Sequence, residues 1–280
     1  EYLAIGSELL TSAYAETNSL FLAEKLDNLG LRLRYKSVVS DRLEDIVQAV
    51  KVAINRSRLI FISGGLGPTE DDRTREAVAQ AVKKPLIFYP EIIKKIKDRF
   101  AWRGAKMTPS NRQQAYIIQG AEILDNPNGT APGMWLETRK HLLVLLPGPP
   151  AEFNPMVEKL MTDRLELYRN KYVLKAIIKT TGAGESWVED RIKPVYRLLP
   201  EDLELTTLAS PGEVLIRLTL RVKEINQENE RIFNKIKNKI INLLGDKVFS
   251  TEGEKLEEVI GHKLAALGQT VACAESCTGG

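Results

Sequence analysis

The stretch that most constrains the fold is the apolar run LIFI (59–62), followed at once by SGGLGPTEDDRTRE (63–76). A buried strand that ends in a glycine turn and leads into a helix points backbone N–H groups and the positive end of the helix dipole outward. Phosphate groups bind well at such a junction. The stretch therefore predicts an α/β fold with an anion site at this turn.

The same stretch is rich in acidic side chains, namely Glu70, Asp71, Asp72 and Glu76. Carboxylates repel a phosphate unless a cation, or Arg73 and Arg75, lies between them. One interpretation is a divalent metal beside the phosphates. The other is structural, because Asp and Glu are also favoured in the first turn of any helix.

Length and composition indicate a globular protein of more than one domain. The 280 residues suggest two domains and a fragment of a third, with 43% hydrophobic and 28% charged residues. No signal peptide or membrane-spanning stretch is evident, so we expect a cytoplasmic protein. The chain starts at Glu1 and stops at Gly280, just after an apolar stretch, which suggests a fragment. The net charge of +3 gives no general case for nucleic acid or an anionic membrane.

Cysteine and histidine are scarce, which limits the kind of metal site. Cys273 and Cys277 lie close together near the end, and His141 and His262 have no partner at zinc-site spacing. A metal would therefore be held by oxygen ligands, which favours Mg²⁺ or Mn²⁺, with Co²⁺ as an alternative.

The first part of the chain predicts alternating strands and helices. We expect strands at 2–5 and 31–40, and a helix that starts near Asn18, which is a candidate cap. Asp41 and Glu44 resemble a capping box at the start of the next helix. However, Glu8, Asp41 and Asp72 each follow a predicted strand. Because open α/β sheets bind ligands at the carboxyl ends of their strands, these three carboxylates could also converge on one crevice.

A second strand, turn and helix junction follows further along the chain. Helices at 75–82 and 91–103 and a strand at 121–124 precede a turn-rich loop at 126–133, which is either a hairpin connection or part of the pocket. The strand at 141–146 then runs into PGPPAE (147–152). From residue 172 the order becomes strand, helix, strand, strand, helix, as in a small α+β domain. A helix at 256–267 and a strand at 270–274 complete the prediction.

Several motifs together resemble those of CinA proteins, whose first domain has the molybdopterin-binding fold. The motif GGLGPxxDDxTxE is matched at seven positions: Gly64, Gly65, Gly67, Pro68, Asp72, Thr74 and Glu76. IGxELL at 5–10 and LPGPPxE at 146–152 also match, although Ser12 stands where the family often has glycine. The resemblance implies a three-layer, mostly parallel α/β domain at 1–168, a KH-like α+β domain at 169–250, and the truncated start of a deamidase domain at 251–280.

The resemblance also implies an activity, which is the metal-dependent hydrolysis of ADP-ribose to AMP and ribose 5-phosphate. Asp72, Glu8 and Asp41 would be catalytic and metal-binding carboxylates. The nucleotide would be bound by the loop residues Gly64, Gly65, Gly67, Thr74 and Gly148 and by the polar side chains of Asn18 and Thr130. Two alternatives are a molybdopterin-binding or adenylating enzyme and a non-catalytic nucleotide sensor.

The resemblance extends to the end of the chain and to partners. Ser276 would be the nucleophile of a nicotinamide mononucleotide deamidase, whose tyrosine and lysine partners would lie beyond Gly280. The family implies a homodimer. We expect no nucleic-acid partner, because no GXXG loop joins two helices in the KH-like region.

Overall fold

The computed structural model describes residues 1–102 and 104–277, and the chain divides into two compact units, Glu1–Arg169 and Asn170–Gly280. The first unit contains a six-stranded sheet with the strand order β2-β1-β3-β8-β7-β6. Its strands are β1 (Tyr2–Ile5), β2 (Lys36–Val39), β3 (Leu59–Ser63), β6 (Glu122–Leu124), β7 (Gly133–Glu137) and β8 (Leu142–Leu146). The pairs among β2, β1, β3 and β8 are parallel, and β7 and β6 add an antiparallel edge. The predicted mostly parallel sheet is confirmed.

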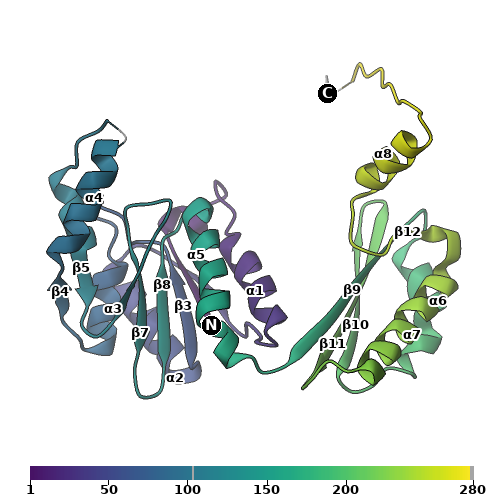
Figure 1. The fold of residues 1–280 in the computed structure, drawn as a ribbon, viewed down its shortest axis with the longest axis horizontal. Helices are drawn as coiled ribbons and strands as arrows, with labels where there is room; N and C mark the ends of the chain where they lie inside the picture. The colour runs from purple at the N-terminus through teal and green to yellow at the C-terminus, as the bar shows by residue number, and fades with distance from the viewer. Residues whose placement is uncertain (103, 278–280) are drawn as a thin grey trace. The chain divides into compact units, whose positions relative to one another are not determined.

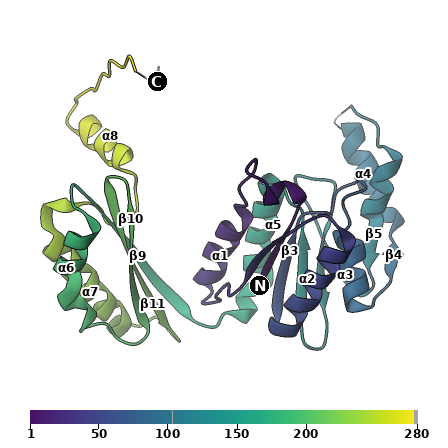
Figure 2. The ribbon, with the colours of Figure 1, turned by 180° about the vertical axis from the view of Figure 1, so that it is seen from behind.

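Helices cover both faces of this sheet, which makes three layers. On one face lie α1 (Asn18–Asn28) and α5 (Pro150–Asp163), and on the other lie α2 (Leu43–Arg56) and α3 (Thr74–Val82). In the view of Figure 1, α5 lies in front of the sheet. In Figure 2, which shows the opposite side, α2 lies in front of the sheet. A two-stranded antiparallel sheet, β4 (Leu86–Phe88) with β5 (Tyr116–Ile118), and helix α4 (Pro90–Trp102) complete the unit, with 3₁₀ helices at Ser7–Leu10, Pro109–Ala115 and Leu165–Tyr168.

The layers follow from the alternation of side chains along buried strands. In β1, Leu3 and Ile5 pack against the α2 and α3 side, whereas Tyr2 and Ala4 pack against the α1 and α5 side. The four residues are 1 to 3% exposed. A strand that is apolar on both faces belongs in the interior of a covered sheet, which is where β1 lies.

Three local predictions are corrected by the structure. The strand predicted at 31–40 begins only at Lys36, because it pairs with β1, and residues 31–35 have no strand opposite them. The cap of α1 is Thr17 rather than Asn18. Helix α2 is preceded by Arg42, so Asp41 and Glu44 form no capping box.

The second unit contains a four-stranded antiparallel sheet in the order β10-β11-β9-β12. Its strands are β9 (Tyr172–Thr181), β10 (Leu203–Ser210), β11 (Glu213–Val222) and β12 (Val248–Ser250), and its helices are α6 (Glu185–Tyr196), α7 (Gln227–Leu244) and α8 (Leu256–Ala266). Side chains of α6 and α7, among them Ile192 and Ile240, share one core with the sheet. Residues 172–250 of this unit form the predicted small α+β domain.

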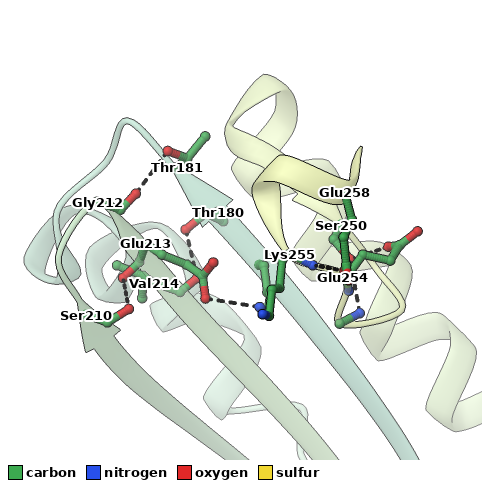
Figure 3. A network of polar contacts seen from close by, with 12 residues as sticks. Thr180, Thr181, Ser210, Gly212, Glu213, Val214, Ser250, Glu254, Lys255 and Glu258 are labelled. Carbon is green, nitrogen blue, oxygen red and sulfur yellow. Dashed lines mark hydrogen bonds and ion pairs between the residues drawn. The ribbon is translucent and has the colours of Figure 1, made fainter. Parts of the chain in front are cut away.

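Ser250 organises the chain between β12 and α8 (Figure 3). Its buried hydroxyl accepts hydrogen bonds from the backbone N–H groups of Gly253 and Glu254, both at 3.0 Å, and donates one to the Glu254 carboxylate at 2.5 Å. The Glu258 carboxylate then accepts the Lys255 N–H at 2.8 Å, at the start of α8. Beyond α8, the strand predicted at 270–274 is absent, because no described strand lies beside it to pair with.

Helix α8 should be much less protected from hydrogen exchange than α7. It contains no buried residue, whereas Phe233, Ile236, Ile240 and Leu244 anchor α7 in the core. Helices of this length are marginal in water without tertiary packing. Amide exchange measured on the 280-residue chain should show fast exchange in α8 and slow exchange in α7. Comparable protection of the two helices would contradict this expectation.

Candidate active site

A cavity of about 730 Å³ lies at the carboxyl-terminal ends of the parallel strands of the first unit. The segments that follow β1, β2, β3 and β8 all contribute to its lining. Glu8, Asp41 and Asp72 are among the lining residues, so the three predicted carboxylates do share one crevice. Gly64, Gly65, Gly67, Gly148, Asn18 and Thr130 also line it.

The turn after β3 can be formed only by glycine. Gly64 and Gly65 have φ angles of 98° and 65°, values that side chains with a Cβ rarely adopt. A Cβ on Gly64 would overlap the Ile5 carbonyl oxygen, and one on Gly65 would overlap the Thr74 hydroxyl. Gly148, on the turn after β8, approaches Gly64 so closely that its Cβ would lie 3.3 Å from the Gly64 Cα. The two glycine turns therefore touch at the floor of the cavity.

Thr74 orients this turn but does not line the cavity. It is fully buried, its hydroxyl donates to the Gly64 carbonyl at 2.8 Å, and its N–H donates to the Gly65 carbonyl at 3.1 Å. The predicted contact between Thr74 and a nucleotide is therefore corrected. Because the C=O and N–H of a trans peptide point in opposite directions, these bonds turn the N–H groups of Gly65 and Leu66 away from Thr74. Neither N–H donates a hydrogen bond to a described residue.

Asp72 is the central acceptor of the loop that follows. Its Oδ1 accepts the Gly67 N–H at 2.7 Å, and its Oδ2 accepts the Thr69 N–H at 2.8 Å and the Thr69 hydroxyl at 2.5 Å. It is not the helix cap, because that position is Arg73. The carboxylate therefore fixes the loop, and the N–H groups of Gly67 and Thr69 are not available to a ligand.

Glu8 and Asp41 are less engaged. Asp41 Oδ2 accepts the Ser7 N–H at 2.8 Å, and the Asp41 N–H donates to the Ser7 hydroxyl at 3.2 Å. These bonds join the segments that follow β1 and β2. The Glu8 side chain is exposed and forms no hydrogen bond or ion pair with a described residue. Within 1–102 and 104–277, no three His, Cys, Asp or Glu side chains are close enough together to hold a metal ion.

Asn18 carries an unpaired acceptor in the cavity wall. The side chain is 8% exposed, and its Nδ2 donates to the Gly148 carbonyl at 2.7 Å and to the Ser63 hydroxyl at 3.2 Å. A carbonyl can only accept, so this bond fixes which end of the amide is the nitrogen. The buried Oδ1 has no partner. An unpaired buried acceptor of this kind suits an N–H or O–H donor on a ligand.

The loop between β6 and β7 is both a hairpin connection and a wall of the cavity. Asn126 holds this loop in place by two hydrogen bonds. The Asn126 Nδ2 donates to the Ala131 carbonyl at 2.9 Å and to the Glu152 carboxylate at 2.7 Å. The Thr130 hydroxyl accepts from Gln114 Nε2 at 3.1 Å. Both interpretations of this loop therefore hold, and a rigid loop presents Thr130 to the cavity.

A partly buried polar cluster in the cavity wall, centred on Glu16, was not predicted from the sequence. Glu16 accepts hydrogen bonds from Tyr2 Oη at 3.0 Å and from Ser19 N at 2.8 Å, and it pairs with Lys36 at 2.7 Å. Burial alone would raise the pKa of Glu16, but the hydrogen bonds from Lys36 and Ser19 lower it overall. Burial raises the pKa of the Tyr2 hydroxyl. In the sequence, Glu16 looks like an ordinary exposed residue before a helix. No motif or spacing in the sequence indicates that it contacts Tyr2, Ser19 and Lys36.

Three further predicted residues are not among those that line the cavity. Arg73 is exposed, and Arg75 is buried behind the glycine turn, so neither lies between the carboxylates and the cavity. Ser276 lies in the second unit and is exposed, with no hydrogen bond to a described residue.

The comparisons with known proteins agree with this arrangement. Residues 1–167 match the family model of a probable molybdopterin binding domain, and residues 175–250 match that of the damage-inducible protein CinA KH domain. A crystal structure of the protein CinA, with unknown function, from Thermoplasma acidophilum has a TM-score of 0.54 and 32% identity, covering 58% of this chain and 95% of that chain. These matches define a molybdopterin-binding-like α/β domain followed by a KH-like domain.

Curated relatives match this chain over its whole length. A putative competence-damage inducible protein of Moorella thermoacetica is 42% identical over 283 residues, and a CinA-like protein of Dictyoglomus turgidum is 36% identical over 280 residues. The matches cover 100% of this chain and 67% and 68% of those relatives. The chain belongs to the CinA-like, competence-damage inducible family. Among the described residues, no helix has the length and apolar character needed to cross a membrane.

Replacing Asp72 by asparagine should destabilise the first unit. Asparagine has one acceptor oxygen where the aspartate has two, and its NH₂ would face an N–H donor of Gly67 or Thr69. The free energy of unfolding should fall by about 0.5 to 1.5 kcal/mol, the net contribution of a hydrogen bond, because Asp72 is only partly buried. The matched control is Asp71→Asn, whose side chain is exposed and forms no hydrogen bond to a described residue. Equal stability of the two variants in urea unfolding would contradict the assigned role of Asp72.

Protonation of Glu16 should make the first unit less stable at acid pH than at neutral pH. The folded-state pKa lies below the ordinary value of 4.5, so the stabilisation is complete above pH 4.5 and is lost as the pH falls through the lowered pKa. Glu16→Gln should therefore lose less stability than the wild type between neutral and acid pH, although it is less stable at pH 7. Glu24→Gln, an exposed change on α1, the helix that follows Glu16, is the control. Parallel stability curves for Glu16→Gln and the wild type would refute this assignment.

Proposed function

We propose that the first unit hydrolyses the diphosphate of ADP-ribose to AMP and ribose 5-phosphate in a metal-dependent reaction. The observation that carries the proposal is the pairing of two kinds of group in one cavity. Gly65 and Leu66 contribute N–H groups without a protein acceptor, and Glu8 and Asp41 contribute carboxylates that remain largely available. N–H groups bind phosphate oxygens, whereas carboxylates need a cation before a phosphate can approach them. A diphosphate with a divalent ion satisfies both.

The size and polarity of the cavity support a nucleotide substrate. Its volume of about 730 Å³ is in the range of sites for ligands of nucleotide size. The unpaired Asn18 Oδ1 needs a hydrogen-bond donor, and ribose hydroxyls and the adenine amino group are such donors. Thr130 offers a hydroxyl in the same cavity lining.

The donor set fits a metal that is held partly by the substrate. Mg²⁺ and Mn²⁺ prefer oxygen ligands, and Mg²⁺ in particular usually binds one or two carboxylates together with substrate phosphates and water. Glu8 and Asp41 would supply the carboxylates, with Asp72 orienting the loop beside them.

The residues of the chain then have distinct tasks in the reaction. Water adds to one phosphorus, the bridging P–O bond breaks, and AMP and ribose 5-phosphate are released. The metal, when bound, neutralises the diphosphate and lowers the pKa of a bound water. The N–H groups of Gly65 and Leu66 would stabilise the negative charge that grows on the phosphoryl oxygens. Gly148 and Asn18 would orient the substrate along the second wall.

Two other functions use the same geometry. A molybdopterin-binding or adenylating enzyme also needs an anion site and a metal, and the description of the matching family as a probable molybdopterin binding domain favours it. A non-catalytic nucleotide sensor would bind ADP-ribose without turnover. As a separate proposal, Ser276 would act as a deamidase nucleophile in a longer protein of this family.

Product analysis tests the proposed reaction. We expect AMP and ribose 5-phosphate from ADP-ribose with Mg²⁺ or Mn²⁺, and no product after the metal is removed with a chelator. Adenylate transfer from ATP to a pterin, without hydrolysis of ADP-ribose, would instead favour the adenylating enzyme. Tight binding of ADP-ribose without turnover under any divalent ion would favour the sensor.

Glu8→Gln tests the role of the cavity carboxylate that forms no hydrogen bond or ion pair with a described residue. The activity should fall by at least about tenfold, as expected when a group that supports a metal is lost, and the metal concentration for half activity should rise. The fold should be unaffected, because the Glu8 side chain is exposed and forms no hydrogen bond or ion pair with a described residue. Glu44→Gln, an exposed change on α2 outside the cavity lining, is the control. Wild-type metal dependence of Glu8→Gln would remove Glu8 from the site.

A further inference from the structure

Arg75 is a buried cation that the proposed reaction does not use directly. Its side chain lies behind the glycine turn, 3% exposed, and it forms no ion pair with any described residue. Instead, its guanidinium donates to the Leu66 carbonyl at 2.5 Å and to the Gly67 carbonyl at 2.9 Å. Taking a cation out of water is costly unless its partners are well placed. An arginine in this position therefore needs an explanation.

Thr74 and Arg75 together hold four consecutive carbonyl groups. Thr74 binds the carbonyls of Gly64 and Gly65, and Arg75 binds those of Leu66 and Gly67. All four donors come from the first two residues of α3. Since each peptide is planar and trans, holding the carbonyls on the α3 side turns the N–H groups of the intervening peptides to the other side. The planar fork of arginine suits two adjacent carbonyls better than the single ammonium of lysine does.

We propose that Arg75 is a positioning residue that holds the 66–67 segment so that the N–H groups of Gly65 and Leu66 remain aligned for an anion. The proposal rests on the proposed function only for the identity of that anion. Arg75 also places a positive charge directly behind the N–H groups, where a low dielectric environment weakens screening. Burial lowers the pKa of Arg75 to about 10, against the opposing effect of the Asp72 carboxylate, so the guanidinium is charged at neutral pH.

Asp72 complements Arg75 from the opposite side of the same peptides. The peptide that joins Leu66 to Gly67 gives its carbonyl to Arg75 and its N–H to Asp72. Gln113 adds a second donor to the Gly67 carbonyl at 3.3 Å and one to the Thr69 carbonyl at 2.7 Å. The part of the loop at 67–69 is therefore fixed on both sides. Between residues 64 and 69, the N–H groups that donate to no described residue are those of Gly65 and Leu66.

Arg75→Met tests this role without a ligand, because methionine keeps much of the apolar length and removes the donors and the charge. The amide NMR signals of Gly65, Leu66 and Gly67 should shift and broaden, while those of α1 on the far side of the sheet stay unchanged. The matched control is Arg73→Met, which removes an exposed arginine that donates only to the Glu70 carbonyl. Wild-type loop signals in folded Arg75→Met would overturn the proposal.

Kinetics and binding give the second readout. For ADP-ribose, kcat/KM should fall by about 10- to 100-fold in Arg75→Met, as expected for misplaced binding groups, and Arg75→Lys should recover part of it. A purely structural role would instead lower thermal stability and leave kcat/KM of the folded protein unchanged, which contradicts the proposal.

If Arg75→Met does not fold, Arg75→Lys is the variant that tests the proposal. Wild-type amide signals together with wild-type kcat/KM in Arg75→Lys would then overturn the proposal. If the wild type does not hydrolyse ADP-ribose, the proposed function is wrong, and weakened binding of pyrophosphate by the Arg75 variants still decides the role of Arg75.

Discussion

The peptide groups at 64–67 can present N–H groups to a ligand only because their carbonyl oxygens are bound on the opposite side. Thr74 and Arg75 provide that restraint from the start of α3, and the glycines provide the positive φ angles. Without the glycines, a Cβ would overlap the end of β1 or the Thr74 hydroxyl. Without the donors from α3, the carbonyls of Gly64, Gly65 and Leu66 would be unpaired in a mostly buried place, at a cost that would reorient the turn. The site therefore depends on this junction more than on any single carboxylate.

The parallel sheet determines what surrounds this junction. Since β1, β2, β3 and β8 point the same way, the segments that follow them meet at one edge and bring Glu8, Asp41, the glycine turn and Gly148 together. The close approach of Gly148 to Gly64 fixes the floor, and Asn18 connects that floor to α1 through the Gly148 carbonyl. The rigid Thr130 loop closes the other wall. An anion in the cavity would thus meet preformed groups, which reduces the cost of ordering on binding.

The fold and the outline of the site could be predicted because they depend on short-range patterns. The apolar run before the glycines predicts β3, and the recurrence of strand, turn and helix predicts the parallel order. Side-chain roles that depend on three-dimensional neighbours could not be read in this way. Asp72 looks like a helix cap in the sequence, yet it binds the loop N–H groups of Gly67 and Thr69. In the sequence, Arg75 is a candidate to lie between the carboxylates and a phosphate, yet it is buried behind the glycine turn. Glu16 gives no signal in the sequence of its partners Tyr2 and Lys36.

The central claim is that the anion binds to the N–H groups of Gly65 and Leu66, and a titration of the wild-type protein with pyrophosphate, followed by amide NMR, tests it most directly. The account predicts large, saturable downfield shifts of the Gly65 and Leu66 amide protons. The Gly67 and Thr69 amides should shift little, because Asp72 already accepts their hydrogen bonds. Saturable binding that leaves the Gly65 and Leu66 signals in place, or that shifts Gly67 and Thr69 instead, would contradict the account.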